Sequence, residues 1–163
     1  MDASMAAMDP TTWLLLCRTV RFGDTDAAGV IHFHQLLRWC HEAWEESLER
    51  FGISAAEIFP AGGPPGSSEA TAPPVALPIV HCSADFRRPL VCGDPLTLQL
   101  QPERLDPSSF EVRTTVLRGD ELVAQGLIRH VAIGLEDRRR CGLPEPLQRW
   151  LEASALGGGV RPL

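Results

Sequence analysis

The sequence predicts an α+β fold in which a single antiparallel sheet wraps around one long helix. Apolar residues recur with a helical period over residues 34–51, whereas the segments before and after have the pattern of strands. One strand-like segment precedes the helix and four follow it. Because the apolar face of a single sheet has to be buried, the long helix is expected to cover it.

The helix predicted for residues 34–51 has one apolar and one charged face. Four apolar residues spaced four apart form the first face: Leu36, Cys40, Trp44 and Leu48. The opposite face carries Arg38, Glu42, Glu45, Glu46 and Glu49. Gly52 follows the last apolar residue and is a favourable C-terminal cap, so the helix is expected to end there.

Five segments have strand character: residues 13–22, 75–86, 96–105, 110–117 and 122–135. Turn signals separate the later ones, namely Cys-Gly-Asp-Pro at 92–95, Asp-Pro-Ser-Ser at 106–109 and Arg-Gly-Asp at 118–120. The last two turns are short, which predicts antiparallel neighbours. A five-stranded antiparallel sheet wrapped around one long central helix is the hotdog fold.

The length of 163 residues suits one domain with less regular ends. Residues 1–11 are expected to form a flexible tail, and residues 12–140 the folded domain. Within that domain, residues 60–74 are rich in Gly, Pro, Ser and Ala, which predicts a mobile connector. Residues 141–163 are expected to hold a short helix, at about 147–156, and a tail.

The charge and cysteine content argue against several classes of protein. A formal net charge of −6 leaves no basic footprint for nucleic acid. No apolar run approaches the roughly 20 residues that span a bilayer, and the acidic start lacks the basic region of a signal peptide, so a soluble cytoplasmic protein is expected. The five cysteines are scattered without a C-x-x-C pair, which indicates neither a disulfide framework nor a zinc site.

The segment Asp24-Thr25-Asp26-Ala27-Ala28-Gly29 allows three interpretations. It begins like a calcium-binding EF-hand loop, but the required oxygen ligand is missing at Ala28 and the required glutamate at Gln35. It could be an acidic turn whose Asp residues cap neighbouring N–H groups. It could also carry a catalytic carboxylate: three small residues follow Asp26, and the free N–H groups of a helix start lie just downstream.

Three histidines near the start of the helix, His32, His34 and His41, raise the question of a metal site. Glu45 lies four residues beyond His41, but a complete site would also need Cys40 or His32 to turn inward, so no metal is predicted. Polar or interface positions, and a general-acid role for one histidine, stay open. No serine lies in a G-x-S-x-G elbow, so a serine hydrolase is not indicated.

The run from Val20 to Ile31 resembles the opening of the 4-hydroxybenzoyl-CoA thioesterase family of hotdog proteins. The resemblance covers roughly residues 16–135. It is closest to the cyanobacterial branch that hydrolyses 1,4-dihydroxy-2-naphthoyl-CoA in phylloquinone synthesis. The segments that resemble this branch are Cys40-His41-Glu42-Ala43, Glu46-Ser47-Leu48, Pro78-Ile79-Val80-His81, Asp85-Phe86, Arg88-Pro89-Leu90 and Cys92-Gly93-Asp94.

The family resemblance implies a role for individual residues. In this family the second Asp of the motif, here Asp26, attacks the thioester carbonyl or activates water to do so. The resemblance places the oxyanion donor at the backbone N–H of Phe33, at the start of the helix. Gly29, His32 and Arg88 are expected to contact the substrate, with Arg88 or a neighbour near the phosphates of CoA. Family members often carry Trp or Tyr where this chain has His32 and Phe33.

The resemblance also implies an acyl-CoA substrate and neither a metal nor an organic cofactor. Family members form dimers whose sheets join, usually paired into tetramers, with the acyl pocket at the subunit interface. The expected reaction is hydrolysis of 1,4-dihydroxy-2-naphthoyl-CoA to 1,4-dihydroxy-2-naphthoate and CoA. The alternatives are another acyl-CoA thioesterase that acts on a 4-hydroxybenzoyl-CoA-like substrate, a non-catalytic acyl-CoA-binding hotdog protein, and a metal-binding module.

Overall fold

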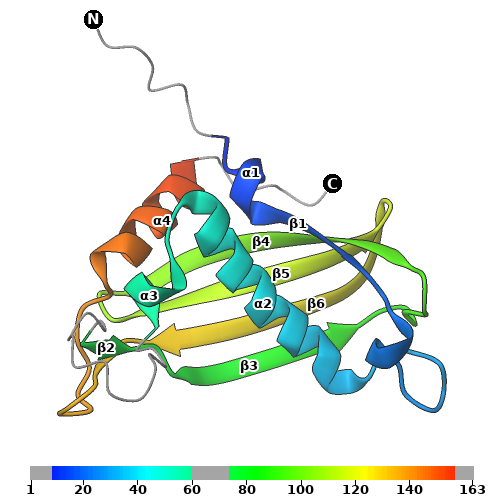
Figure 1. The fold of residues 1–163 in the computed structure, drawn as a ribbon, viewed down its shortest axis with the longest axis horizontal. Coiled ribbons are helices and arrows are strands. Elements are labelled where there is room, and N and C mark those ends of the chain that lie inside the picture. Colours follow the sequence, from blue (N-terminus) through cyan, green and yellow to red (C-terminus); the bar gives the residue numbers. More distant parts are fainter. Residues whose placement is uncertain (1–8, 60–73, 157–163) are drawn as a thin grey trace, which may run out of the picture.

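A computed structural model describes residues 9–59 and 74–156 (Figure 1). The elements are α1 (Thr11–Leu14), β1 (Leu15–Thr19), the 3₁₀ turn η1 (Phe22–Asp24), α2 (Phe33–Phe51), α3 (Ala55–Ile58), β2 (Val75–Ala76), β3 (Ile79–Phe86), β4 (Pro95–Asp106), β5 (Ser109–Arg118), β6 (Glu121–Val131), β7 (Ile133–Gly134) and α4 (Glu145–Leu156). Most of the tail predicted for residues 1–11, and all but the last residue of the connector predicted for 60–74, lie outside the described residues.

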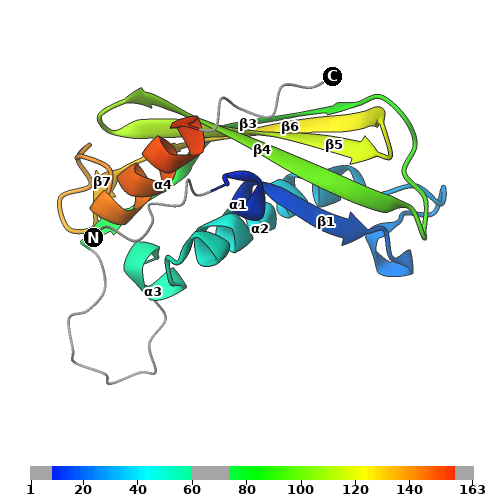
Figure 2. The same cartoon turned by 90° about the horizontal axis from the view of Figure 1, so that it is seen from above.

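Five strands form one antiparallel sheet in the order β1-β4-β5-β6-β3. Figure 2 shows the sheet from above, with its strands forming a curved layer against the helices. The turns at 107–108 and 119–120 are tight and join antiparallel strands, as predicted. The predicted hotdog architecture is therefore confirmed, and β3 forms one edge of the sheet.

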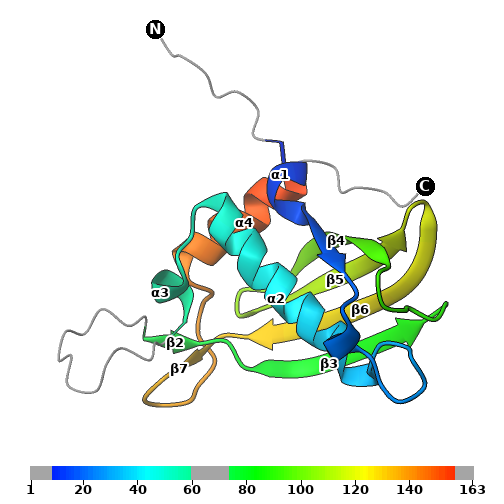
Figure 3. The same ribbon diagram turned by 45° about the vertical axis from the view of Figure 1, so that its right-hand side comes forward.

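Helix α2 lies across one face of this sheet, and it packs mainly against β6 (Figure 3). Its predicted apolar face is buried: Leu36, Cys40, Trp44 and Leu48 are each at most 2 % exposed. Gly126 of β6 allows this close approach, because a Cβ atom at that position would lie 2.5 Å from the Cys40 sulfur. Within the described residues, no helix, α2 included, is long and apolar enough to cross a membrane.

The structure corrects the sequence-based boundaries at three places. Trp13 and Leu14 belong to the helical turn α1 rather than to a strand, and the strand begins only at Leu15. The single strand predicted for 75–86 is divided into β2 and β3. β2 pairs with β7 in a separate two-stranded sheet, which also divides the strand predicted for 122–135. Tertiary packing of Trp13, which is 1 % exposed, outweighs its local strand pattern.

The C-terminal helix α4 packs on the same core as α2. Leu147 and Trp150 are completely buried. The Trp150 indole N–H donates to the Ser47 hydroxyl of α2 at 3.0 Å. The Trp13 indole N–H of α1 donates to the Ser154 hydroxyl of α4, also at 3.0 Å. These two buried hydrogen bonds connect both ends of the described chain to the central helix and to each other.

Candidate active site

The acidic turn is a short hairpin between η1 and α2. Thr25 and Ile31 form an isolated antiparallel bridge. Inside the bridge, the Asp26 N–H donates to the Val30 carbonyl at 2.8 Å, and the Gly29 N–H donates to the Asp26 carbonyl at 3.0 Å. Gly29 has a φ of +80°, which a glycine adopts without steric cost. The glycine of the motif is therefore required by the turn that presents Asp26.

The Asp26 carboxylate is only partly engaged by the protein. Its Oδ1 atom accepts a hydrogen bond from the Ala28 N–H at 2.8 Å, in the manner of an Asx turn. No other described residue contacts this carboxylate through a hydrogen bond or an ion pair, and Asp26 is exposed. One oxygen is therefore oriented by the backbone while the other is available to a ligand.

Helix α2 begins close to this carboxylate without a side-chain cap. His32, the residue before the helix, has extended backbone angles, and its side chain accepts no capping hydrogen bond. In the part of the chain that the structure describes, the backbone N–H groups of Phe33 and His34 have no acceptor. Free N–H groups at the positive end of a helix dipole are suited to bind a carbonyl oxygen that becomes negative during a reaction.

A cavity of about 500 Å³ brings these groups together. Its lining consists of Asp26, Val30, Ile31, His32, Phe33, Phe86, Arg87, Arg88, Pro89 and Leu90. Four of the five predicted site residues, Asp26, His32, Phe33 and Arg88, thus face one space. Gly29 is not among the lining residues; its contribution is the geometry of the turn.

The opposite wall of the cavity comes from the end of β3 and the segment that follows it. No local pattern of residues predicts a role for Phe86, Arg87 and Pro89, because their approach to residues 26–33 depends on how the sheet curves. The backbone N–H groups of Arg87 and Arg88 both donate to the carbonyl of Val123 on β6, which fixes this segment. Both arginines are exposed, and the Arg88 guanidinium is 3.8 Å from the Glu121 carboxylate.

Asp94 holds the loop that completes this wall. Its carboxylate accepts a hydrogen bond from the Val91 N–H at 3.0 Å and another from the Arg118 guanidinium at 2.8 Å. These contacts, led by the Val91 N–H, lower the pKa of Asp94 below its ordinary value. The neighbouring Leu90 carbonyl in turn accepts the Ile31 N–H at 2.9 Å, so the loop and the acidic turn are connected directly.

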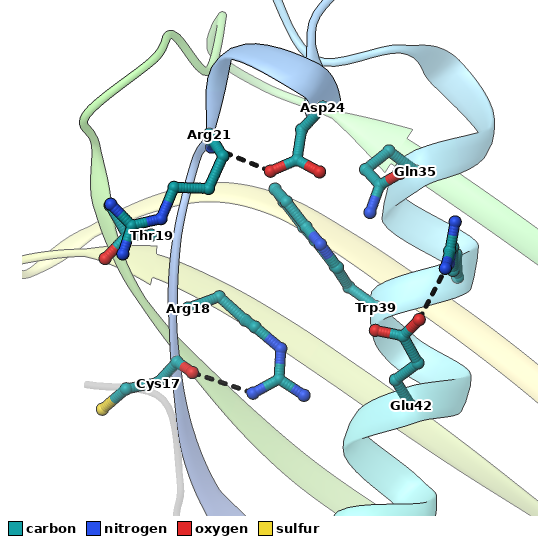
Figure 4. A pocket seen from close by; sticks show the side chains of 9 residues that line it. Cys17, Arg18, Thr19, Arg21, Asp24, Gln35, Trp39 and Glu42 are labelled. Carbon is teal, nitrogen blue, oxygen red and sulfur yellow. Dashed lines mark hydrogen bonds and ion pairs between the residues drawn. The ribbon is translucent and has the colours of Figure 1, made fainter.

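The first aspartate of the motif faces a different space. Asp24 Oδ2 accepts the Arg21 N–H at 2.8 Å, and its carbonyl accepts the His32 N–H at 2.8 Å. Figure 4 shows Asp24 directed toward the gap between β1 and α2, together with Gln35 and Trp39. Asp24 therefore fastens the turn, whereas Asp26 faces the cavity at the helix start.

The histidines lie in two separate places. The rings of His32 and His34 contact each other at the helix start, with centroids 4.0 Å apart and planes tilted by 47°. His41 lies further along α2, where its Nδ1 is 2.7 Å from the Glu45 carboxylate. Among the residues that the structure describes, no three His, Cys, Asp or Glu side chains are grouped as a metal site would require.

Comparisons with known proteins place this architecture in a family. The model of the thioesterase-like superfamily matches residues 20–151, and the chain belongs to that superfamily of hotdog proteins. The chain is 60 % identical over 150 residues to a 1,4-dihydroxy-2-naphthoyl-CoA hydrolase from Prochlorococcus marinus strain MIT 9303, covering 92 % of this chain and 97 % of the relative.

Two solved structures are similar as well. A crystal structure from Prochlorococcus marinus strain MIT 9313 has a TM-score of 0.84 and 58 % identity, covering 90 % of this chain and 99 % of that one. A 1,4-dihydroxy-2-naphthoyl-CoA thioesterase from Synechocystis has a TM-score of 0.73 and 32 % identity, covering 85 % and 94 % respectively. The family predicted from the motif around Asp26 is thereby confirmed.

Proposed function

We propose that this protein hydrolyses 1,4-dihydroxy-2-naphthoyl-CoA to 1,4-dihydroxy-2-naphthoate and CoA, a step of phylloquinone synthesis. One observation carries the proposal. The Asp26 carboxylate, of which only Oδ1 accepts a hydrogen bond from the described residues, lines the same cavity as the uncapped helix start at Phe33. The apolar walls formed by Val30, Phe86 and Leu90 suit an aromatic acyl group. The relatives that act on this thioester support the choice of substrate.

In the proposed reaction, the thioester carbonyl oxygen accepts a hydrogen bond from the Phe33 N–H. Asp26 either removes a proton from the water that attacks the acyl carbon, or attacks that carbon itself to form an anhydride that water then hydrolyses, which restores the carboxylate. A carbon–oxygen bond replaces the carbon–sulfur bond, and the thiolate takes up a proton to leave as CoA. The helix start stabilises the oxyanion that forms on the way. Arg87 and Arg88, at the exposed side of the cavity, are placed to meet the phosphates of CoA.

The test is thiol release from 1,4-dihydroxy-2-naphthoyl-CoA by wild type and two variants. Asp26→Asn is expected to fold, to bind the thioester and to lose about 10²–10⁴-fold in kcat. Asp24→Asn, two residues earlier in the motif, is the matched control. It weakens the turn without changing the lining of the cavity, so the loss of activity should be much smaller. Near-normal hydrolysis by Asp26→Asn, or equal losses in both variants, would contradict the proposed role.

We further propose that two chains join along β3, with the cavity at the interface between them. β3 is an edge strand, and it exposes Ile79, Val80 and Phe86 to 47 %, 55 % and 48 %. Phe33, beside the catalytic carboxylate, is 73 % exposed. Long apolar edges of this kind pair with another chain. A second chain would shield the cavity from water and strengthen the electrostatic contacts inside it.

The assembly is tested by light scattering on Val80→Lys, with Leu105→Lys as the control. Leu105 is 41 % exposed but lies on β4, away from the β3 edge. Val80→Lys should shift the protein toward monomers and lower activity together, whereas Leu105→Lys should change neither. If light scattering gives Val80→Lys the same number of chains per assembly as wild type, the chains do not join at this edge.

A further inference from the structure

The side chain of His32 has a buried nitrogen without a partner. Its Nδ1 atom is inaccessible to solvent, and no hydrogen bond reaches it from any described residue. The ring contacts two others, with centroid distances of 4.0 Å to His34 and 4.9 Å to Phe33. Burying a ring nitrogen without a hydrogen-bond partner costs free energy. We therefore asked whether the other nitrogen of the ring has a function that explains this orientation.

The other nitrogen, Nε2, is the part of His32 that can meet a ligand. It is neither buried nor hydrogen-bonded to a described residue, and His32 lines the cavity that contains Asp26. A neutral imidazole carries one proton. Orphaned buried N–H groups are rarer than orphaned acceptors, so the proton belongs on Nε2. His32 therefore presents a fixed N–H donor to the cavity.

The other polar side chains of the cavity already have different tasks. Asp26 supplies the carboxylate for the reaction. Arg87 and Arg88 are exposed charged groups on the rim, which suits the phosphates of CoA rather than an acyl ring. His32 is only partly accessible, its ring contacts that of Phe33, and the apolar side chain of Ile31 lines the same cavity. It is the neutral donor best placed to meet a polar substituent on an otherwise apolar acyl group.

We propose that His32 Nε2–H donates a hydrogen bond to the ring hydroxyl adjacent to the thioester, which makes His32 a specificity-determining residue for ortho-hydroxyaryl thioesters. This inference rests on the proposed thioesterase function. In such substrates the hydroxyl proton bonds internally to the thioester carbonyl, and the hydroxyl oxygen is left to accept from His32. An aryl thioester without that hydroxyl covers the Nε2–H donor without accepting from it, and is therefore disfavoured.

The experiment compares kcat/KM for 1-hydroxy-2-naphthoyl-CoA and 2-naphthoyl-CoA in wild type, His32→Phe and His34→Phe. Phe keeps an aromatic ring in contact with His34 and Phe33 and removes the donor. Wild type should favour the hydroxylated thioester, and His32→Phe should reduce that ratio about 3- to 10-fold, mainly by slowing the hydroxylated substrate. His34→Phe, which changes the exposed neighbouring ring, should keep the wild-type ratio.

The possible outcomes distinguish the proposed thioesterase function from the specificity role of His32. If wild type hydrolyses neither of these thioesters nor 1,4-dihydroxy-2-naphthoyl-CoA, the proposed function fails. If wild type is active but His32→Phe keeps the ratio, or slows both substrates equally, the specificity role of His32 is refuted. A second measurement needs no variant: nitrogen NMR of wild-type histidines should show an Nε2–H ring whose signal shifts with 1-hydroxy-2-naphthoate and not with 2-naphthoate. Equal shifts with both acids would also overturn the proposal.

Discussion

Helix α2 begins at an exposed, uncapped turn and ends 19 residues later in a closed, hydrogen-bonded cap. At the start, the Phe33 and His34 N–H groups are free, and the Phe33 ring is largely exposed. At the end, Gly52 adopts a φ of +105° and donates to the Glu49 carbonyl, while the Ile53 N–H donates to the Leu48 carbonyl. At the C-terminal end, these carbonyl groups of the helix accept hydrogen bonds from the protein itself. At the N-terminal end, the free N–H groups are available to a ligand.

The side chains around the two ends of α2 also differ, because they are closely packed at the C-terminal end and leave a cavity at the N-terminal end. Near the end, Trp44 is buried among aromatic rings, and Trp150 of α4 is buried beside Ser47. Near the start, a cavity replaces such packing. The contrast shows that stability is concentrated at one end of the helix and the proposed chemistry at the other. Changes at the packed end should therefore affect unfolding, and changes at the open end should affect catalysis.

The largest expected effect on stability is that of Trp150→Ala. The side chain is completely buried and donates to Ser47, so its removal leaves a large cavity and an unpaired hydroxyl. The free energy of unfolding should fall by about 3–5 kcal/mol in urea titrations. Ser47→Ala, which removes only the acceptor, should cost about 1–3 kcal/mol. A decrease of less than about 1 kcal/mol in the unfolding free energy of Trp150→Ala would show that packing around this end of α2 contributes little to stability.

A second prediction concerns pH and His130, which stacks on Phe110 and also contacts the ring of Trp44 at the packed end. Burial lowers the pKa of His130 to about 4, against a weaker opposing effect of its contact with the Leu77 carbonyl. Between about pH 6.5 and pH 4 the unfolded chain binds more protons at this site, so stability falls as the pH falls.

The expected loss from this residue between pH 7 and pH 5 is roughly 2 kcal/mol, measured as the change in unfolding free energy. His130→Phe keeps an aromatic ring and removes the titrating group. Its stability should therefore depend less on pH over the same range. An equally steep dependence in His130→Phe would assign the effect to other groups.

The smallest expected effects on stability come from one substitution at each end of α2. His32→Ser introduces a favourable N-cap at a position with suitable backbone angles, φ −63° and ψ 138°. The unfolding free energy should rise by about 0.5–1 kcal/mol while thioester hydrolysis declines. Gly52→Ala at the other end should lower stability by about 1 kcal/mol and leave kcat unchanged. A destabilised, fully active His32→Ser variant would remove the distinction between an end for binding and an end for stability.

Local patterns were enough to predict the main elements. The spacing of Leu36, Cys40 and Trp44 predicted α2 to within one residue at its start, and Gly52 marked its end. Short turns predicted the antiparallel pairs β4–β5 and β5–β6. These features depend on neighbours a few residues apart, which the sequence displays directly. The helical turn at Trp13 was missed because its burial depends on α4, which lies about 140 residues away.

By itself, the sequence determined the fold class, the family and the motif that supplies Asp26, since these depend on periodicity and on short contiguous segments. Only the tertiary structure decided that Asp24 and Asp26 face different spaces, that Phe86 and Arg88 complete the cavity, and that His32 has one buried nitrogen. Side-chain direction in a tight turn and contacts between distant strands depend on backbone angles and sheet curvature. No local residue pattern encodes these separately from the packing that fixes them.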